Sequence, residues 1–447
     1  MAPLVIFIAV LFIHVAAKSD DCSLLQAKRQ AKVTAAAEPI LTIADEDLGG
    51  AESAPSPSCA LTGFRNAELV MGTEAADEAN RALYAQAMRW AISTIDHTPA
   101  QAFQEVRLSP GRGMFPDMGV GHWEMMVFPT TPEVLNSTSW YLSNTTELSS
   151  APCSFQLEEA VFFRGFYWGE FQYAHVLFDL VPMFVWMSTS HPEAKLVMEL
   201  DTSKKIQEFM HWFSPALHQR TTFVQSGDVV CAATLWAVVP HVAVIHALRT
   251  PGLVNHLRNY ILEAHPTYKA ATALYMKRVA ATAGHGRLLT DSSSQQVLQL
   301  ARAAIERHDS PLTVLEFDGT SNGSTASFQE QYRLFNSAPL VFGPHGTGFV
   351  SVLFTRCDVP VAAIEFVCGA HTHNVTGCGK GPRNSTKVRA ATMWQMLGGT
   401  SWVRYFHVLT HAASEGPTDF MEVDLDGFSV AFERALQHLN SSEPKAP

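Results

Sequence analysis

Short apolar runs alternate with longer amphipathic stretches along most of the chain from residue 158 onward. The apolar runs predict strands at residues 158–167, 194–200, 221–239, 273–279, 312–317 and 339–342. The amphipathic stretches predict helices at residues 169–189, 203–213, 253–264, 293–307 and 327–335. Strands that alternate with helices at this spacing are typical of parallel sheets covered by helices on both faces. We therefore expect an α/β fold of two Rossmann-like domains facing a cleft.

Two of the predicted helices have a recognisable start. Ser293 with Gln296, and Ser327 with Glu330, have the spacing of a capping box, in which each side chain bonds the backbone N–H of the other residue. Composition separates the N-terminal region from the globular part of the chain, because the region before residue 61 is rich in Ala, Ser, Pro and acidic residues. The chain is predicted to comprise a leader at 1–17, a stem or linker at 18–60, an N-terminal α/β domain at 61–265, and a C-terminal Rossmann-like domain at 270–440.

The leader is apolar from residue 2 to residue 17 and ends in the small residues Ala16 and Ala17. It is short for a membrane span, which needs roughly twenty residues. A cleaved signal peptide and a short retained membrane anchor both fit this pattern. Sequons support entry into the secretory pathway independently, and they begin at Asn136, Asn144, Asn322, Asn374, Asn384 and Asn440. We expect the protein in the lumen of the Golgi or endoplasmic reticulum, or secreted.

Charge and composition exclude some classes of protein. The chain has 447 residues, of which 47% are hydrophobic, and a formal net charge of −11. This length and hydrophobicity suit two globular cores. A general nucleic-acid binder needs a basic surface, so nucleic acid is not an expected partner.

The seven cysteines predict disulfides, since a secretory lumen is oxidising. Cys368 and Cys378 are close in sequence and are the pair we expect to be bridged. His371 and His373 lie between them, which leaves a zinc site as the alternative. The spacing is not a common zinc pattern, and the sequon at Asn374 would crowd a metal, so we expect no metal. Cys231 and Cys357 lie in apolar stretches of the sequence. Buried free thiols are therefore the alternative to disulfides at these two positions.

The segment Gly343-Pro344-His345-Gly346-Thr347-Gly348 follows a predicted strand and precedes a short predicted helix. Three glycines in six residues let a backbone come close to a bound group, and a helix N-terminus attracts an anion. Glu365 ends the next predicted strand, where open α/β sheets bind ligands. Together they predict a phosphate-bearing ligand, with Glu365 accepting from sugar hydroxyls. The alternative is a tight turn with a packed histidine.

Other polar residues also suit chemistry. His175 and Asp179 share one stripe of the helix predicted at 169–189, and such a pair can serve as a general base or simply cap a loop. Arg278 and Arg287 flank the loop after the strand at 273–279, where guanidinium groups would suit a diphosphate, although both could be solvated surface charges.

Ser321 lies in a Gly-x-Ser-x-Gly pattern, 319–323, that matches the nucleophile elbow of α/β-hydrolases. An elbow needs its helix to begin directly after the serine, but the predicted helix cap is Ser327. The sequon at Asn322 would also place a glycan beside the nucleophile. A chance match is therefore favoured, and a secreted hydrolase remains an alternative function.

Taken in chain order, three segments resemble glycosyltransferase family 61, which holds plant xylosyl- and arabinosyltransferases and animal O-linked GlcNAc transferases of the secretory pathway. The resemblance runs from about residue 161 to 366 and rests on residues 172–182, on 274–278 with Arg287, and on 328–365. Gln172, Lys277 and Thr347 depart from the residues usual in the family.

The resemblance implies a GT-B fold and an inverting transfer of a sugar from a UDP-sugar to a glycan or glycoprotein, without an obligatory metal. It implies that the domain at 61–265 is on the acceptor side and that the domain at 270–440 is on the nucleotide-sugar side. The phosphate-binding set would be the arginine pair, the glycine loop and the acid after it: Arg278, Arg287, Gly343, His345, Gly346, Thr347, Gly348 and Glu365. His175, assisted by Asp179, would activate the acceptor hydroxyl. A catalytically silent carbohydrate-binding protein is the further alternative.

Overall fold

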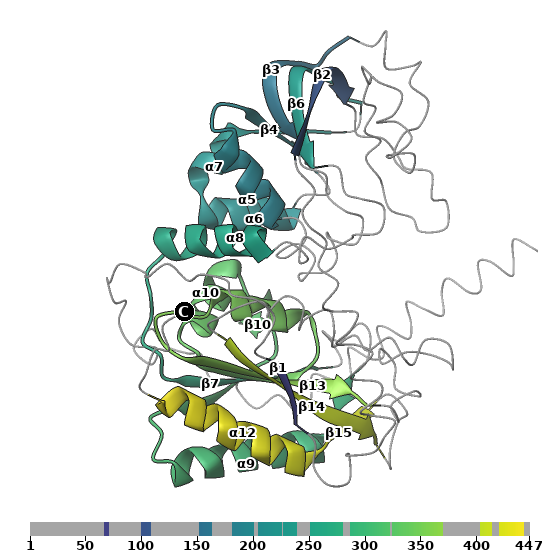
Figure 1. The fold of residues 1–447 in the computed structure, drawn as a ribbon. Coiled ribbons are helices and arrows are strands. Elements are labelled where there is room, and N and C mark those ends of the chain that lie inside the picture. The colour runs from purple at the N-terminus through teal and green to yellow at the C-terminus, as the bar shows by residue number, and fades with distance from the viewer. Residues whose placement is uncertain are drawn as a thin grey trace, which may run out of the picture. The chain divides into compact units, whose positions relative to one another are not determined.

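A computed structural model of the chain describes eleven stretches: residues 67–70, 100–108, 152–162, 181–200, 204–225, 227–238, 251–279, 287–321, 324–369, 403–413 and 420–441. All of them belong to one compact unit, residues 48–447. The fold is mixed α/β and contains two sheets built mainly from parallel strands (Figure 1). The arrangement of two domains facing a cleft stays a prediction.

The larger sheet lies in the C-terminal half of the chain. Its strands run in the order β8 (Leu288–Leu289), β15 (Phe420–Val423), β14 (Val403–Ala412), β13 (Val361–Cys368), β12 (Leu340–Pro344), β7 (Thr272–Met276) and β9 (Thr313–Phe317), with β1 (Ala67–Val70) also paired to β14. All neighbours are parallel except β14 and β15. The central strands are buried on both faces, as expected for a parallel sheet covered by helices.

Helices cover both faces of this sheet (Figure 1). On one face lie α9 (Asp291–Arg307) and α12 (Leu425–Asn440), whose apolar residues join alternate residues of the strands in one core. On the other face lie α10 (Phe328–Asn336) and the 3₁₀ helix η4 (Thr347–Phe354). Because strand side chains alternate between faces, Phe342, Ile364 and Phe406 face α12. Their neighbours in the sequence must therefore face the α10 and η4 side.

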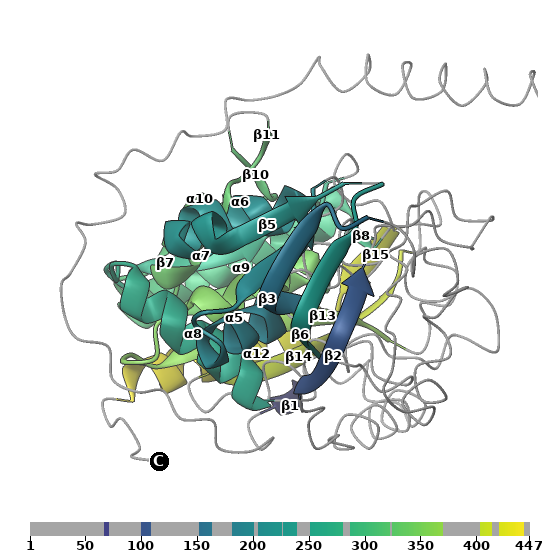
Figure 2. The same cartoon turned by 90° about the horizontal axis from the view of Figure 1, so that it is seen from above.

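The second sheet has the strand order β2 (Ala100–Leu108), β6 (Val230–Val238), β3 (Phe155–Phe162), β4 (Lys195–Glu199) and β5 (Thr221–Val224). Its strands are parallel except for β2, which is antiparallel to β6 (Figure 2). The helices of this part are α5 (Val181–Ser190), α6 (Lys204–Phe213), α7 (Pro215–Arg220) and α8 (Pro251–Ala264). None of the described helices is long and apolar enough to cross a membrane.

Aromatic side chains of α6 meet those of α10. The Phe209 and Phe328 rings pack edge to face with centroids 5.2 Å apart. The ring centroids of Trp212 and Tyr332 are 5.6 Å apart. The Tyr332 hydroxyl donates to the carbonyl of Pro266 in the segment after α8. This segment lies where the two predicted domains, 61–265 and 270–440, meet in the sequence.

The predicted strands and helices that fall on described residues are confirmed in type, and most of their ends shift by a few residues. The run at 221–239 forms two strands, β5 and β6, because a turn with Gly227 at φ +96° separates them. The capping box at Ser327 and Glu330 is confirmed. The box at Ser293 is wrong, because α9 begins at Asp291 with Thr290 as its cap. The Ser293 hydroxyl accepts instead from the N–H of Val423, a contact between distant segments.

The alternative of a buried free thiol at Cys231 is also wrong. Cys231, in β6, forms a disulfide with Cys153, which stands just before the neighbouring strand β3. Cys357 and Cys368 are disulfide-bonded as well. Cys378 lies outside the described residues, so its pairing with Cys368 stays a prediction.

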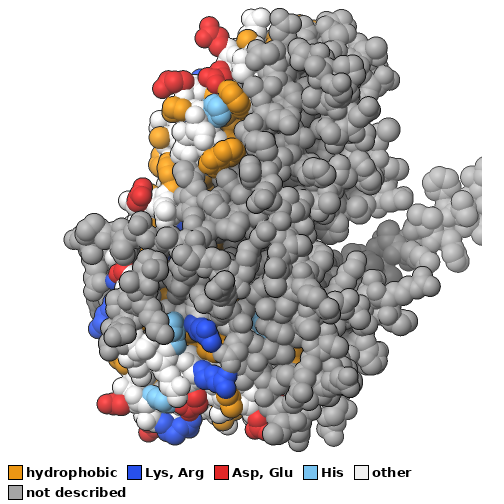
Figure 3. All heavy atoms as spheres, viewed as in Figure 1, with side chains coloured by type: hydrophobic (Ala, Val, Ile, Leu, Met, Phe, Trp, Pro, Cys, Tyr) orange, Lys and Arg blue, Asp and Glu red, His pale blue; other side chains and the backbone are white. Residues whose placement is uncertain are grey.

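On the face shown in Figure 3, acidic and basic side chains lie interspersed over the lower part of the described surface.

Candidate functional site

The order of the strands defines a switch point between β7 and β12. After β7 the chain places β9 on one side, and it then crosses to the other side of β7 to form β12. In open α/β sheets, ligands bind beyond the carboxyl ends of the strands at such a point. Arg278 follows the end of β7, and His345 and Gly346 follow the end of β12. Two of the predicted phosphate-binding segments therefore meet at the expected place in the sheet.

Each glycine of the loop makes room for the end of β7. A β-carbon on Gly343 would meet the carbonyl oxygen of Met276, and one on Gly348 would stand 2.5 Å from the Met276 methyl carbon. A β-carbon on Gly346 would meet Nη1 of Arg278. The prediction that these glycines admit a bound group directly is therefore corrected: they admit Met276 and Arg278, which close packing brings against the loop.

The two loop glycines Gly343 and Gly346 differ in backbone conformation. Gly343 has φ +148°, a value that side chains rarely adopt. Gly346 has φ 179°, an extended conformation open to any residue. The requirement for glycine there comes from the space that the Arg278 guanidinium occupies.

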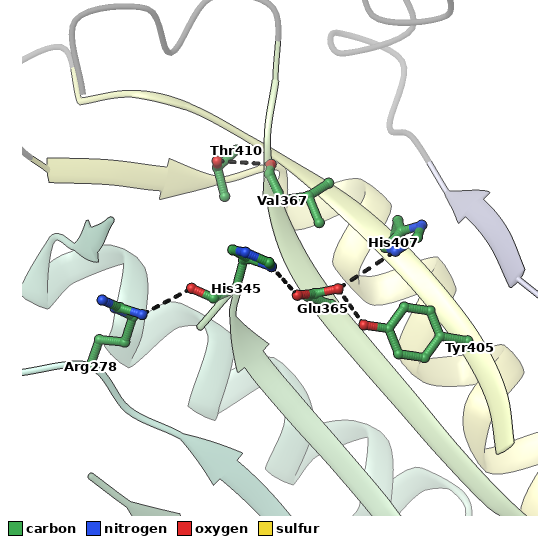
Figure 4. Close-up of polar contacts among 7 residues, drawn as sticks. All are labelled: Arg278, His345, Glu365, Val367, Tyr405, His407 and Thr410. Carbon is green, nitrogen blue, oxygen red and sulfur yellow. Dashed lines mark hydrogen bonds and ion pairs between the residues drawn. The ribbon is translucent and has the colours of Figure 1, made fainter. Parts of the chain in front are cut away.

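Arg278 is a partly buried cation without an acidic partner among the described residues. Its Nη1 donates to the carbonyl of His345 at 3.1 Å, and its buried Nε has no hydrogen-bond partner in the described part of the chain (Figure 4). Burial lowers the pKa of the Arg278 guanidinium, which still stays charged at neutral pH. A buried cation normally has a counter-ion, so this side chain has the character of an anion ligand.

Arg287 adds a second positive charge to the same place. It is buried, and its backbone has φ +60°, which holds it at the start of β8. Burial, together with the charges of Arg287 and Arg278, lowers the pKa of His345 against the opposing effect of Glu365. The predicted arginine pair therefore converges on the glycine loop.

His345 is bonded to Glu365, which itself lies in the interior. The imidazole Nδ1 meets Oε1 of Glu365, and the hydroxyl of Tyr405 donates to Oε2 (Figure 4). His407 places its Nε2 3.6 Å from the same oxygen. Glu365 is fully buried. The expectation that it accepts from ribose hydroxyls is therefore corrected, because its oxygens already have protein partners and no exposure.

The loop leads into a helix N-terminus, as predicted, and that helix is the 3₁₀ helix η4. The first N–H groups of a helix have no acceptor within it. Among the described residues, none accepts from the N–H groups of Gly346 or Gly348. Gly346 lies beside Arg278, and these main-chain donors add to the positive character of the site.

Several predicted site residues lie outside the described part of the chain. They include the general-base pair His175 and Asp179, and five sequon residues: Asn136, Asn144, Asn322, Asn374 and Asn384. Asn440 is described and is the exposed last residue of α12. In the described ranges, no group of three or more His, Cys, Asp or Glu side chains is placed to hold a metal ion.

Tyr405 and His407 are site residues that the sequence interpretation missed. They alternate with the buried Phe406 and Val408 along β14, and the register places His407 directly beside Glu365. The signal was present as polar residues at every second position of an apolar strand.

Ser321 does not stand at a nucleophile elbow. It belongs to β10 (Thr320–Ser321), which forms a hairpin with β11 (Ser324–Thr325), and α10 begins only at Phe328. Its hydroxyl donates to Oε1 of Glu330 at 2.6 Å. A nucleophilic serine needs a neighbouring base with a free lone pair, whereas Glu330 is engaged in the cap of α10. The geometry therefore gives the hydrolase alternative no support.

Comparison with known families agrees with the resemblance found in the sequence. The family model described as Glycosyltransferase 61 matches residues 173–362, a segment that spans both arginines and the glycine loop. A search of curated proteins found no match. The match confirms the predicted resemblance to glycosyltransferase family 61, and it suggests glycosyltransferase activity acting on a sugar donor and an acceptor.

Proposed function

We propose that this protein is an inverting glycosyltransferase that moves a sugar from a UDP-sugar to a glycan or glycoprotein in the secretory pathway. One observation carries the proposal: the Arg278 guanidinium, which has no acidic partner in the described chain, lies at the switch point of the sheet against the glycine loop. A nucleotide diphosphate is an anion that such a site would bind. The family match supplies the reaction class.

Each residue of the proposed site has its own role in the transfer. Arg278 and Arg287 would neutralise the diphosphate, which becomes the leaving group, and the N–H groups at the start of η4 would add hydrogen bonds. Charge-assisted hydrogen bonds of this kind are worth about 1.5–3 kcal/mol each. His175, with Asp179, would take the proton of the acceptor hydroxyl. The protein itself would thus stabilise the negative charge that develops as the glycosidic bond to the nucleotide breaks.

Entry into the secretory pathway is part of the proposal. The apolar leader and six sequons favour it, and so does the Cys153–Cys231 disulfide, because disulfides persist in oxidising compartments. Glycosidase treatment of protein made in eukaryotic cells should increase its gel mobility. Unchanged mobility would contradict the lumenal assignment without touching the proposed chemistry.

The donor site is tested by ligand protection. A panel of UDP-sugars is added to the purified protein, and thermal unfolding is followed for the wild type, Arg278→Ala and a control, Arg302→Ala. Arg302 is an exposed arginine of α9 paired with Glu316 at 3.8 Å. We expect protection of the wild type and the control by at least one UDP-sugar, and loss of most of it in Arg278→Ala. Equal protection of all three proteins would contradict the proposed site.

The acceptor side is tested by transfer. His175→Ala should lose sugar transfer while it keeps protection by the UDP-sugar, because the base contacts the acceptor and not the diphosphate. Wild-type protein that binds UDP-sugars but transfers no sugar to any glycan or glycoprotein would favour the silent carbohydrate-binding alternative.

A further inference from the structure

Glu365 is a carboxylate buried in the middle of a parallel sheet. The register places it between Gly343 of β12 and His407 of β14, and its exposed fraction is 0%. A buried carboxylate is unfavourable unless hydrogen bonds and opposite charges compensate for its lost hydration. The groups that compensate the Glu365 carboxylate therefore indicate its role in the site.

Those groups lie on the face of the sheet opposite α12. Alternation along β13 and β14 directs Ile364 and Phe406 toward the apolar core, and it directs Glu365, Tyr405 and His407 to the other face. There the Tyr405 hydroxyl holds one carboxylate oxygen and the Nδ1 of His345 meets the other (Figure 4). His407 contacts the carboxylate at 3.6 Å. Glu365 therefore orients the His345 ring, and β14 holds Glu365.

The charges around the pair decide its protonation state. The titratable or charged groups that face His345 and Glu365 in the described chain are Tyr405, His407, Arg278 and Arg287. Burial raises the pKa of Glu365, but hydrogen bonds from His345 and His407, which neutral imidazoles can still donate, lower the pKa, so the carboxylate is ionised. Burial and the two arginines lower the pKa of His345. The unliganded pair is then a neutral imidazole that donates Nδ1–H to a carboxylate.

His345 keeps one open position in this arrangement. Its side chain is 8% exposed, and within the described ranges no residue bonds to its Nε2. The carbonyl of the same residue accepts from Arg278, so an anion bound by that guanidinium would lie near the imidazole. Such an anion would cancel the positive charges that keep the ring neutral.

We infer that His345 takes up one proton from solvent at Nε2 when the diphosphate of a UDP-sugar binds at Arg278, an inference that rests on the proposed function. The imidazolium then lies between the Glu365 carboxylate and the bound anion and donates a hydrogen bond to each. Glu365, held by Tyr405 and His407, is a positioning residue that acts through His345. The site would thus gain a positive charge only when the diphosphate is present.

The test measures protons directly. The UDP-sugar that protects the wild type is titrated calorimetrically in buffers of different ionisation enthalpy, and the slope gives the number of protons taken up. A UDP-sugar is the right probe because each of its phosphates carries one ester and one anhydride bond and has no proton that titrates near neutral pH, whereas the terminal phosphate of UDP itself titrates with a pKa of about 6. We expect uptake approaching one proton in the wild type near pH 7 or above. Linkage then requires the affinity to fall up to roughly tenfold per pH unit as the pH rises.

Variants separate this role from a structural one. His345→Asn can still donate to Glu365 but cannot titrate, so we expect it to bind without proton uptake and with little dependence of affinity on pH. Tyr405→Phe removes one donor to the carboxylate, which strengthens its negative field, and should move the pH at which affinity falls to a higher value. His411→Gln is the control, because His411 of β14 is an exposed residue that pairs with Glu422 of β15 in the same sheet and should keep wild-type uptake.

The outcomes are distinguishable from those of the proposed function. UDP-sugar binding by the wild type with no proton uptake between about pH 6 and 8 would overturn the inference and leave the donor site standing. Uptake that persists in His345→Asn would overturn it too, because the proton would then bind elsewhere. A wild type that binds no UDP-sugar would overturn both.

Discussion

The guanidinium of Arg278 occupies the space that a β-carbon on Gly346 would need. That carbon would meet Nη1 and lie 3.3 Å from Cζ. The neighbouring carbonyl of His345 accepts a hydrogen bond from the same Nη1 at 3.1 Å. The segment after β7 and the loop after β12 are therefore interlocked, and the position of the cation depends on the absence of a side chain at residue 346.

This relationship predicts the effect of Gly346→Ala. The methyl group should displace the guanidinium and weaken UDP-sugar binding by roughly tenfold, the loss expected for one charge-assisted contact. The fold should survive, because an extended φ of 179° suits any residue. Calorimetry gives the affinity and circular dichroism the fold. Gly348→Ala is the matched control, since its β-carbon would meet only the flexible methyl end of Met276.

A double-mutant cycle sharpens the prediction. If Gly346→Ala acts by moving the guanidinium, it should cost little further affinity in an Arg278→Ala background. Additive losses in the double variant would show that residue 346 contacts the ligand by itself, and the interlock would not explain the glycine.

Gly343→Ala should act on stability instead. The new methyl group would meet the carbonyl oxygen of Met276 in the neighbouring strand, and φ +148° would be strained as well. We expect a loss of about 2 kcal/mol or more in the free energy of unfolding, measured with denaturant. Gly319→Ala controls for the strain alone, because φ there is +87° and no atom lies within 4 Å of the new carbon. Equal losses in both variants would contradict the packing argument.

The strands and helices could be predicted from the sequence where local signals decide them. The Ser327–Glu330 capping box is an example, since both partners lie within one turn. Ser293 had the same spacing, yet its hydroxyl bonds Val423, and no local pattern reveals a partner 130 residues away. Thr290, which caps that helix instead, is also a favoured cap residue although it ranks below serine, so tertiary contacts decide between them.

The candidate site divides in the same way. Arg278 and His345 follow strands β7 and β12, and residues at the carboxyl ends of parallel strands converge by geometry alone. Arg287 lies at the start of β8, so its approach to the same place depends on the tertiary fold. Tyr405 and His407 could not be assigned, because their role depends on which strand pairs with β13 and in which register. The role of Glu365 was misjudged for this reason: a position at a strand end does not show whether another strand covers it.

The Cys153–Cys231 disulfide should contribute substantially to stability. It closes a long loop, with a sequence separation of 78, and joins β6 to the segment just before the neighbouring strand β3. Replacing both cysteines by serine should lower the free energy of unfolding by about 2–4 kcal/mol, measured by denaturant unfolding without reductant. Reductant should bring the wild type toward the variant, and identical stabilities of the two in its absence would contradict the prediction.

His265 should make the fold sensitive to mild acid. Its ring stacks on Trp212 with centroids 4.3 Å apart and planes inclined by 12°. Its Nε2 is buried without a hydrogen-bond partner in the described chain, and burial lowers its pKa from the ordinary value of 6.5. Below about pH 6.5, His265 is therefore protonated in the unfolded chain, whereas in the folded protein it stays neutral to a lower pH. By linkage, stability is lost as the pH falls below that value.

His265→Phe should relieve this sensitivity. Phenylalanine keeps an aromatic ring against Trp212. It also removes a buried nitrogen that lacks a hydrogen-bond partner, and the presence of such a nitrogen destabilises the fold by about 1–3 kcal/mol. We expect a variant that is more stable than the wild type at neutral pH and loses less stability between about pH 6.5 and 5, followed by denaturant unfolding at each pH. The control is His211→Phe, at an exposed position of the same helix as Trp212. Other acid-sensitive groups, His345 among them, act equally in all three proteins, so the difference between variants isolates His265. Parallel stability curves for the wild type and His265→Phe would show that His265 takes up its proton in the folded state.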